Sequence, residues 1–149
     1  MFNKTVVAAT LALAAPFAFA APAAAGDCPS GQEKANALAG HPTAPKAVTD
    51  TVIGAIDLGA EIGVNGRELR TRRLVVQPGG IVPMHSHKGR PALIVTVSGE
   101  ITEHRSTCAV GIVHKAGDIS REAEGISHWW QNHGTEPAVL LSSDVFMKQ

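Results

Sequence analysis

Two short segments that carry histidine decide the fold: residues 79–87 are GGIVPMHSH, and residues 117–132 are GDISREAEGISHWWQN. Successive side chains of a β-strand point to opposite faces, so His85 and His87 share one face and are able to bind a single ion together. Two histidines alone are a weak signal, because such pairs are common on exposed strands. The context of the pair, a glycine-led segment followed by a second one, makes the signal specific.

Outward from these segments, short apolar or alternating runs are separated by turn sequences such as Asn65-Gly66 and Pro78-Gly79-Gly80. Nothing after Thr51 keeps a helical apolar period over three turns, so helix-rich architectures are disfavoured. The sequence predicts an all-β protein, an antiparallel sandwich or barrel. The nine predicted strands are 51–58, 68–77, 81–87, 92–98, 100–105, 110–115, 118–122, 127–132 and 138–146.

Over roughly residues 69–146 the chain resembles a cupin. The first motif of that family, G-x5-HxH-x3,4-E-x6-G, is matched by Gly79, His85, His87 and Gly99, with Ala92 at the glutamate position. The second motif, G-x5-PxG-x2-H-x3-N, is matched by Gly117, Gly125, His128 and Asn132, with Ala123 in place of proline. The resemblance implies a double-stranded β-helix, that is, a jelly-roll barrel.

The resemblance also implies a metal held by His85, His87 and His128. Three imidazoles leave part of the coordination sphere open, as catalytic sites do. The ion is one divalent transition metal, and the sequence leaves Fe, Mn, Ni, Cu and Zn open. Ala92 cannot coordinate it, so three neutral ligands leave the full 2+ charge to attract an oxygen chelate. Whether Glu103 or Glu122 replaces the missing carboxylate stays open.

Glu122 and Glu103 are the candidate catalytic acid/base groups, with solvated strand carboxylates as the alternative. The candidate substrate-binding residues are Trp130, Arg90 and Thr96, because strand alternation or loop position puts each near the ligands. For Trp130 the alternative is a core side chain, and for Arg90 a solvated loop residue. Surface positions are expected for His41, His104, His114 and His133, and a charged edge strand for the arginines at 67, 70, 72 and 73.

Residues 1–25 have a basic start, an apolar stretch and small residues before Gly26, which predicts a secretory signal peptide. Pro16 disfavours the alternative, a retained membrane anchor. The mature protein is therefore expected to be periplasmic or secreted. Residues 26–50 are predicted to be an N-terminal arm with a short helix possible at 32–38, and 51–149 the barrel. In such a compartment Cys28 and Cys108 are expected to form a disulfide, the alternative being two free thiols.

Thirteen basic and thirteen acidic residues give no net charge, which argues against a nucleic-acid partner, and the absence of tyrosine excludes a tyrosine base. The leading hypothesis is a metal-dependent dioxygenase-type oxidoreductase, resembling quercetinase-like cupins, that acts on a small oxygen-chelating substrate. The alternatives are a non-catalytic cupin that binds metal or a small anion, and a metal-dependent isomerase or lyase. The expected partner is a small molecule, with no membrane contact after signal cleavage; a homodimer is possible.

Overall fold

A computed structural model describes residues 26–148, so the predicted signal peptide at 1–25 lies outside the described residues. The protein is nearly all-β, which confirms the predicted fold class. Residues 26–148 form eight strands and one short helix: β1 (Lys46–Asp57), α1 (Leu58–Ile62), β2 (Arg67–Ser86), β3 (Ala92–Ser98), β4 (Glu100–Arg105), β5 (Ile112–Lys115), β6 (Ile119–Glu122), β7 (Ser127–Gln131) and β8 (Ala138–Met147).

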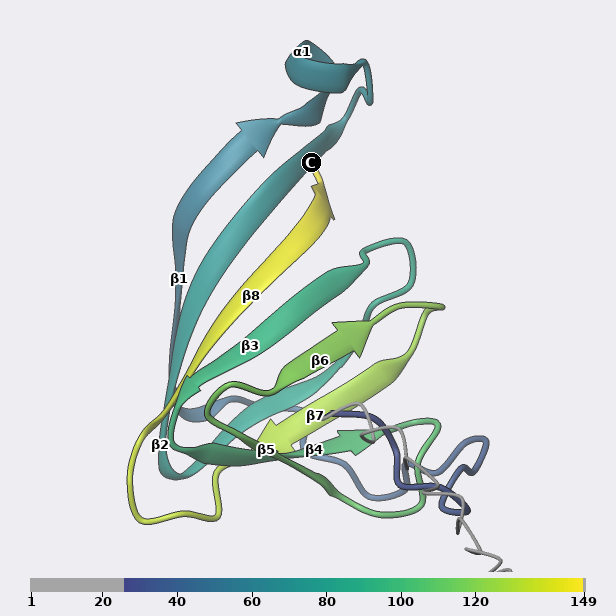
Figure 1. The fold of residues 1–149 in the computed structure, drawn as a ribbon, viewed down its shortest axis with the longest axis vertical. Coiled ribbons are helices and arrows are strands. Elements are labelled where there is room, and N and C mark those ends of the chain that lie inside the picture. Colours follow the sequence, from purple (N-terminus) through teal and green to yellow (C-terminus); the bar gives the residue numbers. More distant parts are fainter. Residues whose placement is uncertain (1–25, 149) are drawn as a thin grey trace, which may run out of the picture.

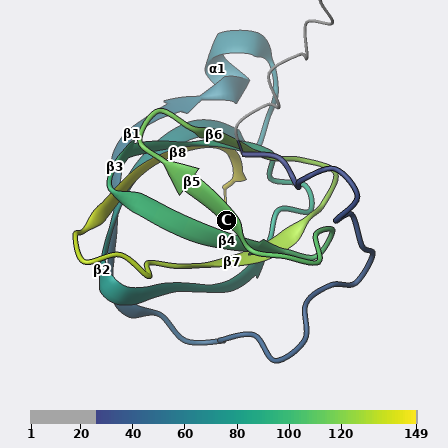
Figure 2. The same ribbon diagram turned by 60° about the horizontal axis from the view of Figure 1, so that its bottom comes forward.

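The strands form one antiparallel sheet in the order β5-β4-β7-β2-β8-β3-β6, with β1 also paired to β2. The sheet curls into a nearly closed barrel, as Figures 1 and 2 show, and this is the predicted jelly-roll architecture. In Figure 1, β1, α1 and the first half of β2 extend above the rest of the barrel.

The predicted strands 68–77 and 81–87 are one continuous strand, β2, so the turn expected between them is wrong. Gly79 adopts a φ of 71°, and a Cβ on Gly80 would lie 2.8 Å from the backbone oxygen of Ala47. These glycines bend β2 instead of ending it, because Asn132 forms a backbone hydrogen bond with each of them. The Gly79 N–H donates to the Asn132 carbonyl at 2.9 Å, and the Asn132 N–H donates to the Gly80 carbonyl at 3.0 Å. The bent strand pairs with β8 before the glycines and with β7 after them.

Alternating burial along the strands separates the barrel interior from its surface, as in β8, where every second residue from Ala138 to Asp144 is buried. The apolar core consists of Leu74, Val76, Ile94, Ile101, Trp130, Ala138 and Leu140. The interior also buries charged groups, including Glu103, Glu122 and Asp144. Buried charges require partners, and these carboxylates have them.

The N-terminal segment lies against the turn between β4 and β5. A disulfide joins Cys28 to Cys108, with Cα atoms 5.6 Å apart, and Glu33 forms a β-bridge with Cys108. The helix considered at 32–38 is absent from the described chain, and β1 begins at Lys46, within the predicted arm. Between residues 26 and 148, no helix has the length and apolar character needed to cross a membrane.

Candidate metal centre

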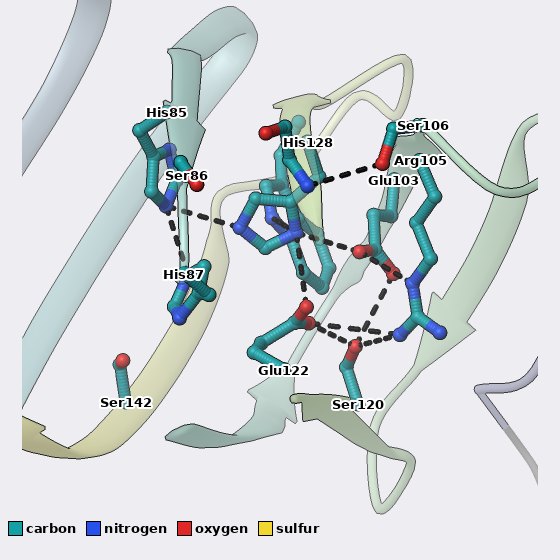
Figure 3. Close-up of polar contacts among 12 residues, drawn as sticks. His85, Ser86, His87, Glu103, Arg105, Ser106, Ser120, Glu122, His128 and Ser142 are labelled. Atoms are coloured by element: carbon teal, nitrogen blue, oxygen red, sulfur yellow. Dashed lines mark hydrogen bonds and ion pairs between the residues drawn. The ribbon is translucent and has the colours of Figure 1, made fainter. Parts of the chain in front are cut away.

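Three histidine side chains from the two motif segments meet inside the barrel (Figure 3). His85 near the end of β2 is the register partner of His128 on β7, and His87 follows directly after β2. The Nε2 atom of His85 lies 3.2 Å from Nε2 of His87 and 3.0 Å from Nε2 of His128. Pairing of β2 with β7 therefore brings together residues that are more than 40 positions apart.

A hydrogen-bond acceptor faces the other ring nitrogen of each histidine. The Nδ1–H group of His85 donates to the Pro83 carbonyl at 2.9 Å, and that of His87 donates to the Arg90 carbonyl at 2.9 Å. The Nδ1–H group of His128 donates to Oε1 of Glu103 at 2.6 Å. Each acceptor fixes the proton on Nδ1, so all three Nε2 lone pairs point toward one another.

This arrangement fits a metal ion. Burial is the main cause that lowers the pKa of His85 to about 4 and that of His87 to about 3, so these two rings are neutral near pH 7. Three imidazoles with facing Nε2 lone pairs offer a cation three nitrogen ligands. Two nitrogen ligands at about 2.0–2.1 Å from one ion lie about 2.9–3.4 Å apart, which agrees with the spacing of the His85 nitrogen from its neighbours.

The two predicted catalytic carboxylates lie on the Nδ1 side of the His128 ring, which faces away from His85 (Figure 3). Glu103 accepts hydrogen bonds from His128, from His114 Nε2 at 2.9 Å and from Arg105 Nε at 2.7 Å. Glu122 accepts one from Ser120, and its Oε2 atom lies 3.3 Å from His128 Nδ1 without a hydrogen bond of its own. Neither carboxylate belongs to the group formed by the three Nε2 atoms.

The pKa values of the two carboxylates shift in opposite directions. Burial alone would raise the pKa of Glu103, but hydrogen bonds from His114 and His128 outweigh it and hold that pKa well below its usual range. Burial raises the pKa of Glu122 because its partners compensate less, and the nearby charge of Glu103 adds to this shift. Ionisation is therefore favoured more at Glu103 than at Glu122, and Arg105 is in contact with both carboxyl groups.

Glu103, Glu122 and His128 also come close enough together to suggest a second cation site. The Arg105 guanidinium already supplies the positive charge there: its Nε donates to Glu103, and its Nη2 lies 3.6 Å from Glu122. A metal ion at this place would have to displace a buried ion pair. Glu103 and Glu122 are therefore better placed to hold the His128 ring in position than to bind a second ion.

Ala92 occupies the position where the motif has glutamate, and its partners on both neighbouring strands are acidic residues. Ala92 is the register partner of Glu122 on one side and of Asp144 on the other. Directly opposed residues of a sheet share a face, so both carboxylates lie on the face of Ala92. Glu122 is directed to His128 Nδ1, and Asp144 is held by Arg70 and Arg90.

A cavity of about 280 Å³ lies next to His85. Its apolar wall is mainly Leu74, Val82, Ile94, Trp130 and Leu140, and its polar wall is Asp50, Arg72, Arg90 and Ser142. Of the predicted substrate-binding residues, Trp130 and Arg90 line this cavity. Thr96 is buried but does not line it. The indole Nε1 of Trp130 lies 3.2 Å from His128 Nδ1.

Two expectations about residues outside the motifs are wrong. His114 is fully buried and bonded to Glu103, not at the surface; the alternation of Ile112 and His114 along β5 was the available signal. The arginine run does not lie on an edge strand, because β1 and β8 flank the first half of β2. Arg70 and Arg72 instead face the buried Asp144.

Fold and site together define a barrel of the cupin class with a candidate three-histidine metal centre. Residues 72–144 match the family model described as the cupin domain, and the chain belongs to the cupin family through them. It is 33% identical over 90 residues to auxin-binding protein ABP19b of Prunus persica, covering 54% of this chain and 40% of that protein. It is 31% identical over 99 residues to germin-like protein 8-14 of Oryza sativa subsp. japonica, covering 64% and 44%. The chain thus spans less than half the length of these relatives.

Solved structures agree on the fold. TT1209 from Thermus thermophilus superposes with a TM-score of 0.53 at 16% identity, covering 68% of this chain and 85% of that one. The Schizosaccharomyces pombe Cnp3 cupin domain superposes with a TM-score of 0.53 at 12% identity, covering 67% and 65%. At such low identity the likeness concerns architecture alone.

Proposed function

We propose that this protein is a metal-dependent, dioxygenase-type oxidoreductase that acts on a small oxygen-chelating molecule in the cavity beside His85. The observation that carries the proposal is the convergence of three Nε2 lone pairs whose Nδ1 protons are all fixed by acceptors. His85, His87 and His128 would hold one divalent ion, whether Fe, Mn, Ni, Cu or Zn. When bound, the ion supplies Lewis acidity and open positions for oxygen ligands.

The protein's own residues bind and orient the substrate. Trp130, Ile94 and Leu140 provide an apolar wall that keeps water from the bound molecule. Arg90 donates to Asp144 at 2.7 Å and faces the same cavity, so it is placed to attract a negatively charged group. Glu103 holds the His128 proton at Nδ1 and so keeps Nε2 free.

A positioning role for Glu103 and Glu122 fits their place behind His128 better than proton transfer to a substrate, since both are fully buried on the Nδ1 side. This placement favours a second candidate function. A barrel without an acid/base group beside its Nε2 atoms is also suited to bind a metal and a small anion without turnover. A metal-dependent isomerase or lyase would need such a group from the substrate or from water.

We also infer that the protein is exported. The signal-like segment at 1–25 supports this inference, and so does the disulfide between Cys28 and Cys108, which persists in oxidising compartments.

Metal analysis and oxygen consumption together test the function. Purified mature protein is expected to carry one divalent ion per chain, which His128→Ala loses and His41→Ala, a change at an exposed histidine of the N-terminal segment, keeps. Oxygen uptake with catechol and enediol substrates should follow metal content. Metal retention without uptake would support the binding protein instead, and failure to bind any of the five metals would reject the centre.

A further inference from the structure

The polar wall of the cavity carries more positive than negative charge. Arg72 on β2 and Arg90 in the loop before β3 line it, and Asp50 on β1 is the acidic residue that lines it. His85 lines the same cavity, so a molecule bound against the arginines also lies against the candidate metal centre.

The partners of these arginines are largely shared. The buried Asp144 carboxylate accepts two hydrogen bonds from Arg70, at 3.0 and 2.8 Å, and a third from Arg90 at 2.7 Å. Arg72 Nη2 lies 3.9 Å from the same carboxylate. Asp50 accepts a hydrogen bond from Arg72 Nη1, and its side chain is 39% exposed. Three guanidinium groups thus share two carboxylates, and one of these carboxylates is partly in water.

Arg72 is the group with unused capacity. Its Nε atom is buried and has no hydrogen-bond partner, and its Nη2 contact with Ser142 is long, at 3.5 Å. A buried donor that lacks a partner is costly, so the present contacts leave this guanidinium incompletely satisfied. The guanidinium edge presents several N–H donors in a fixed plane, which matches the two oxygens of a carboxylate.

We propose that Arg72 and Arg90 bind the carboxylate of a monoanionic organic acid whose apolar body packs against Trp130, Leu140 and Ile94. The single excess positive charge suits one carboxylate better than a phosphate dianion, and the apolar wall suits a hydrocarbon body better than a sugar. This inference rests on the proposed function, because it concerns the same cavity beside His85. It adds the chemical class of the substrate. Binding to the guanidinium groups itself requires no metal.

Calorimetric titration of metal-free protein with benzoate and with benzamide, its neutral counterpart, tests the proposal. Wild type should bind benzoate about tenfold or more tightly than benzamide, and Arg72→Gln should lose most of this preference. Arg73→Gln is the matched control, because it makes the same change at the exposed neighbouring position on β2. Asp50→Asn frees Arg72 from a competing carboxylate and should strengthen benzoate binding.

Equal affinity for benzoate and benzamide, no benzoate binding at millimolar concentration, or full preference in Arg72→Gln would overturn the proposal. Displacement of benzoate by inorganic phosphate at equal concentration would replace it with a phosphate site. If Arg72→Gln fails to fold, Asp50→Asn decides, because unchanged benzoate affinity in that variant contradicts the role of Arg72. Since the titration uses metal-free protein, failure of the metal centre and failure of the anion site are separate results.

Discussion

Replacing Glu103 by glutamine should weaken metal binding without removing a ligand. In the wild type, the His128 Nδ1 nitrogen lies 2.6 Å from a Glu103 carboxylate oxygen. Glutamine keeps a carbonyl oxygen that is able to accept the Nδ1–H hydrogen bond, but it removes the negative charge that makes the imidazole a stronger donor to a metal. Loss of such an outer partner typically lowers metal affinity about 10- to 100-fold, which is about 1.4–2.7 kcal/mol. We expect a loss in this range.

The same change should also destabilise the fold, and the two effects can be separated. Arg105 donates to Glu103 at 2.7 Å and lies 3.6 Å from Glu122, so Glu103→Gln leaves a buried guanidinium with one weaker carboxyl neighbour. Breaking a buried pair in this way costs about 3–5 kcal/mol. Glu122→Gln is the matched control: burial raises the pKa of Glu122, so an uncharged amide resembles its protonated form. Glu122→Gln should therefore lower metal affinity and folding stability less than Glu103→Gln does.

Competition of each metal-free protein with a chromophoric chelator for Zn²⁺ measures affinity, and urea unfolding measures stability. Nitrogen NMR of the imidazoles reports which ring nitrogen of His128 carries the proton. We expect the Nδ1–H form to be less populated in Glu103→Gln. If this variant folds and binds Zn²⁺ within twofold of wild type, with an unchanged His128 tautomer, then the carboxylate does not position the ligand.

Four further predictions concern pH, the disulfide, the bend and assembly. His85 and His87 have pKa values of about 4 and 3 when folded, against 6.5 when unfolded. Because the unfolded chain binds more protons, metal-free protein should lose about 1.4 kcal/mol of stability per histidine for each pH unit from 6.5 down to 4, and urea unfolding across pH checks this. A flat profile would contradict the burial of neutral rings. Reduction of Cys28–Cys108, 80 residues apart, should cost about 4–5 kcal/mol in thermal or urea unfolding, and a negligible change would show that the N-terminal segment is held by other contacts. Gly80→Ala should destabilise by at least about 1 kcal/mol, since its Cβ would meet the Ala47 carbonyl; wild-type stability in urea unfolding would mean that the bend adapts. The largely exposed β1, which pairs with β2 alone among the described strands, predicts a homodimer in sedimentation experiments at micromolar concentration, and a monomer throughout would refute it.

Local patterns were sufficient to predict most strands. Alternation and glycine punctuation placed β3 and β4 at their observed bounds, and β8 to within one residue. The same patterns failed at the Pro-Gly-Gly sequence, because whether glycines end a strand or bend it depends on distant partners, here Asn132. The motif spacing was sufficient to predict that the three histidines meet, because strand pairing places the two motifs on neighbouring strands, β2 and β7.

The contacts of Arg70, Arg72 and Arg90 with Asp144 could not be predicted from the sequence, for the same reason. Arg70 and Asp144 are 74 residues apart and meet only through the register of β2 with β8. Charge alternation along β2 therefore suggested a solvated edge, whereas the closed sheet turns Arg70 and Arg72 toward a buried carboxylate. His114 differs in one respect: its alternation with Ile112 along β5 signalled its burial, but nothing in the local pattern identified Glu103 as its partner.

The bend in β2 links the two halves of the candidate site. Arg72 lies in the half of β2 that pairs with β8, and His85 lies in the half that pairs with β7, with Gly79 and Gly80 between them. Both side chains line one cavity, so the angle of the bend sets the distance between the anion-binding group and the metal ligand. A chelating acid must span that distance. A change at Gly80 that leaves the fold intact should therefore alter benzoate affinity in metal-loaded protein more than in metal-free protein, because only the former requires both ends to fit.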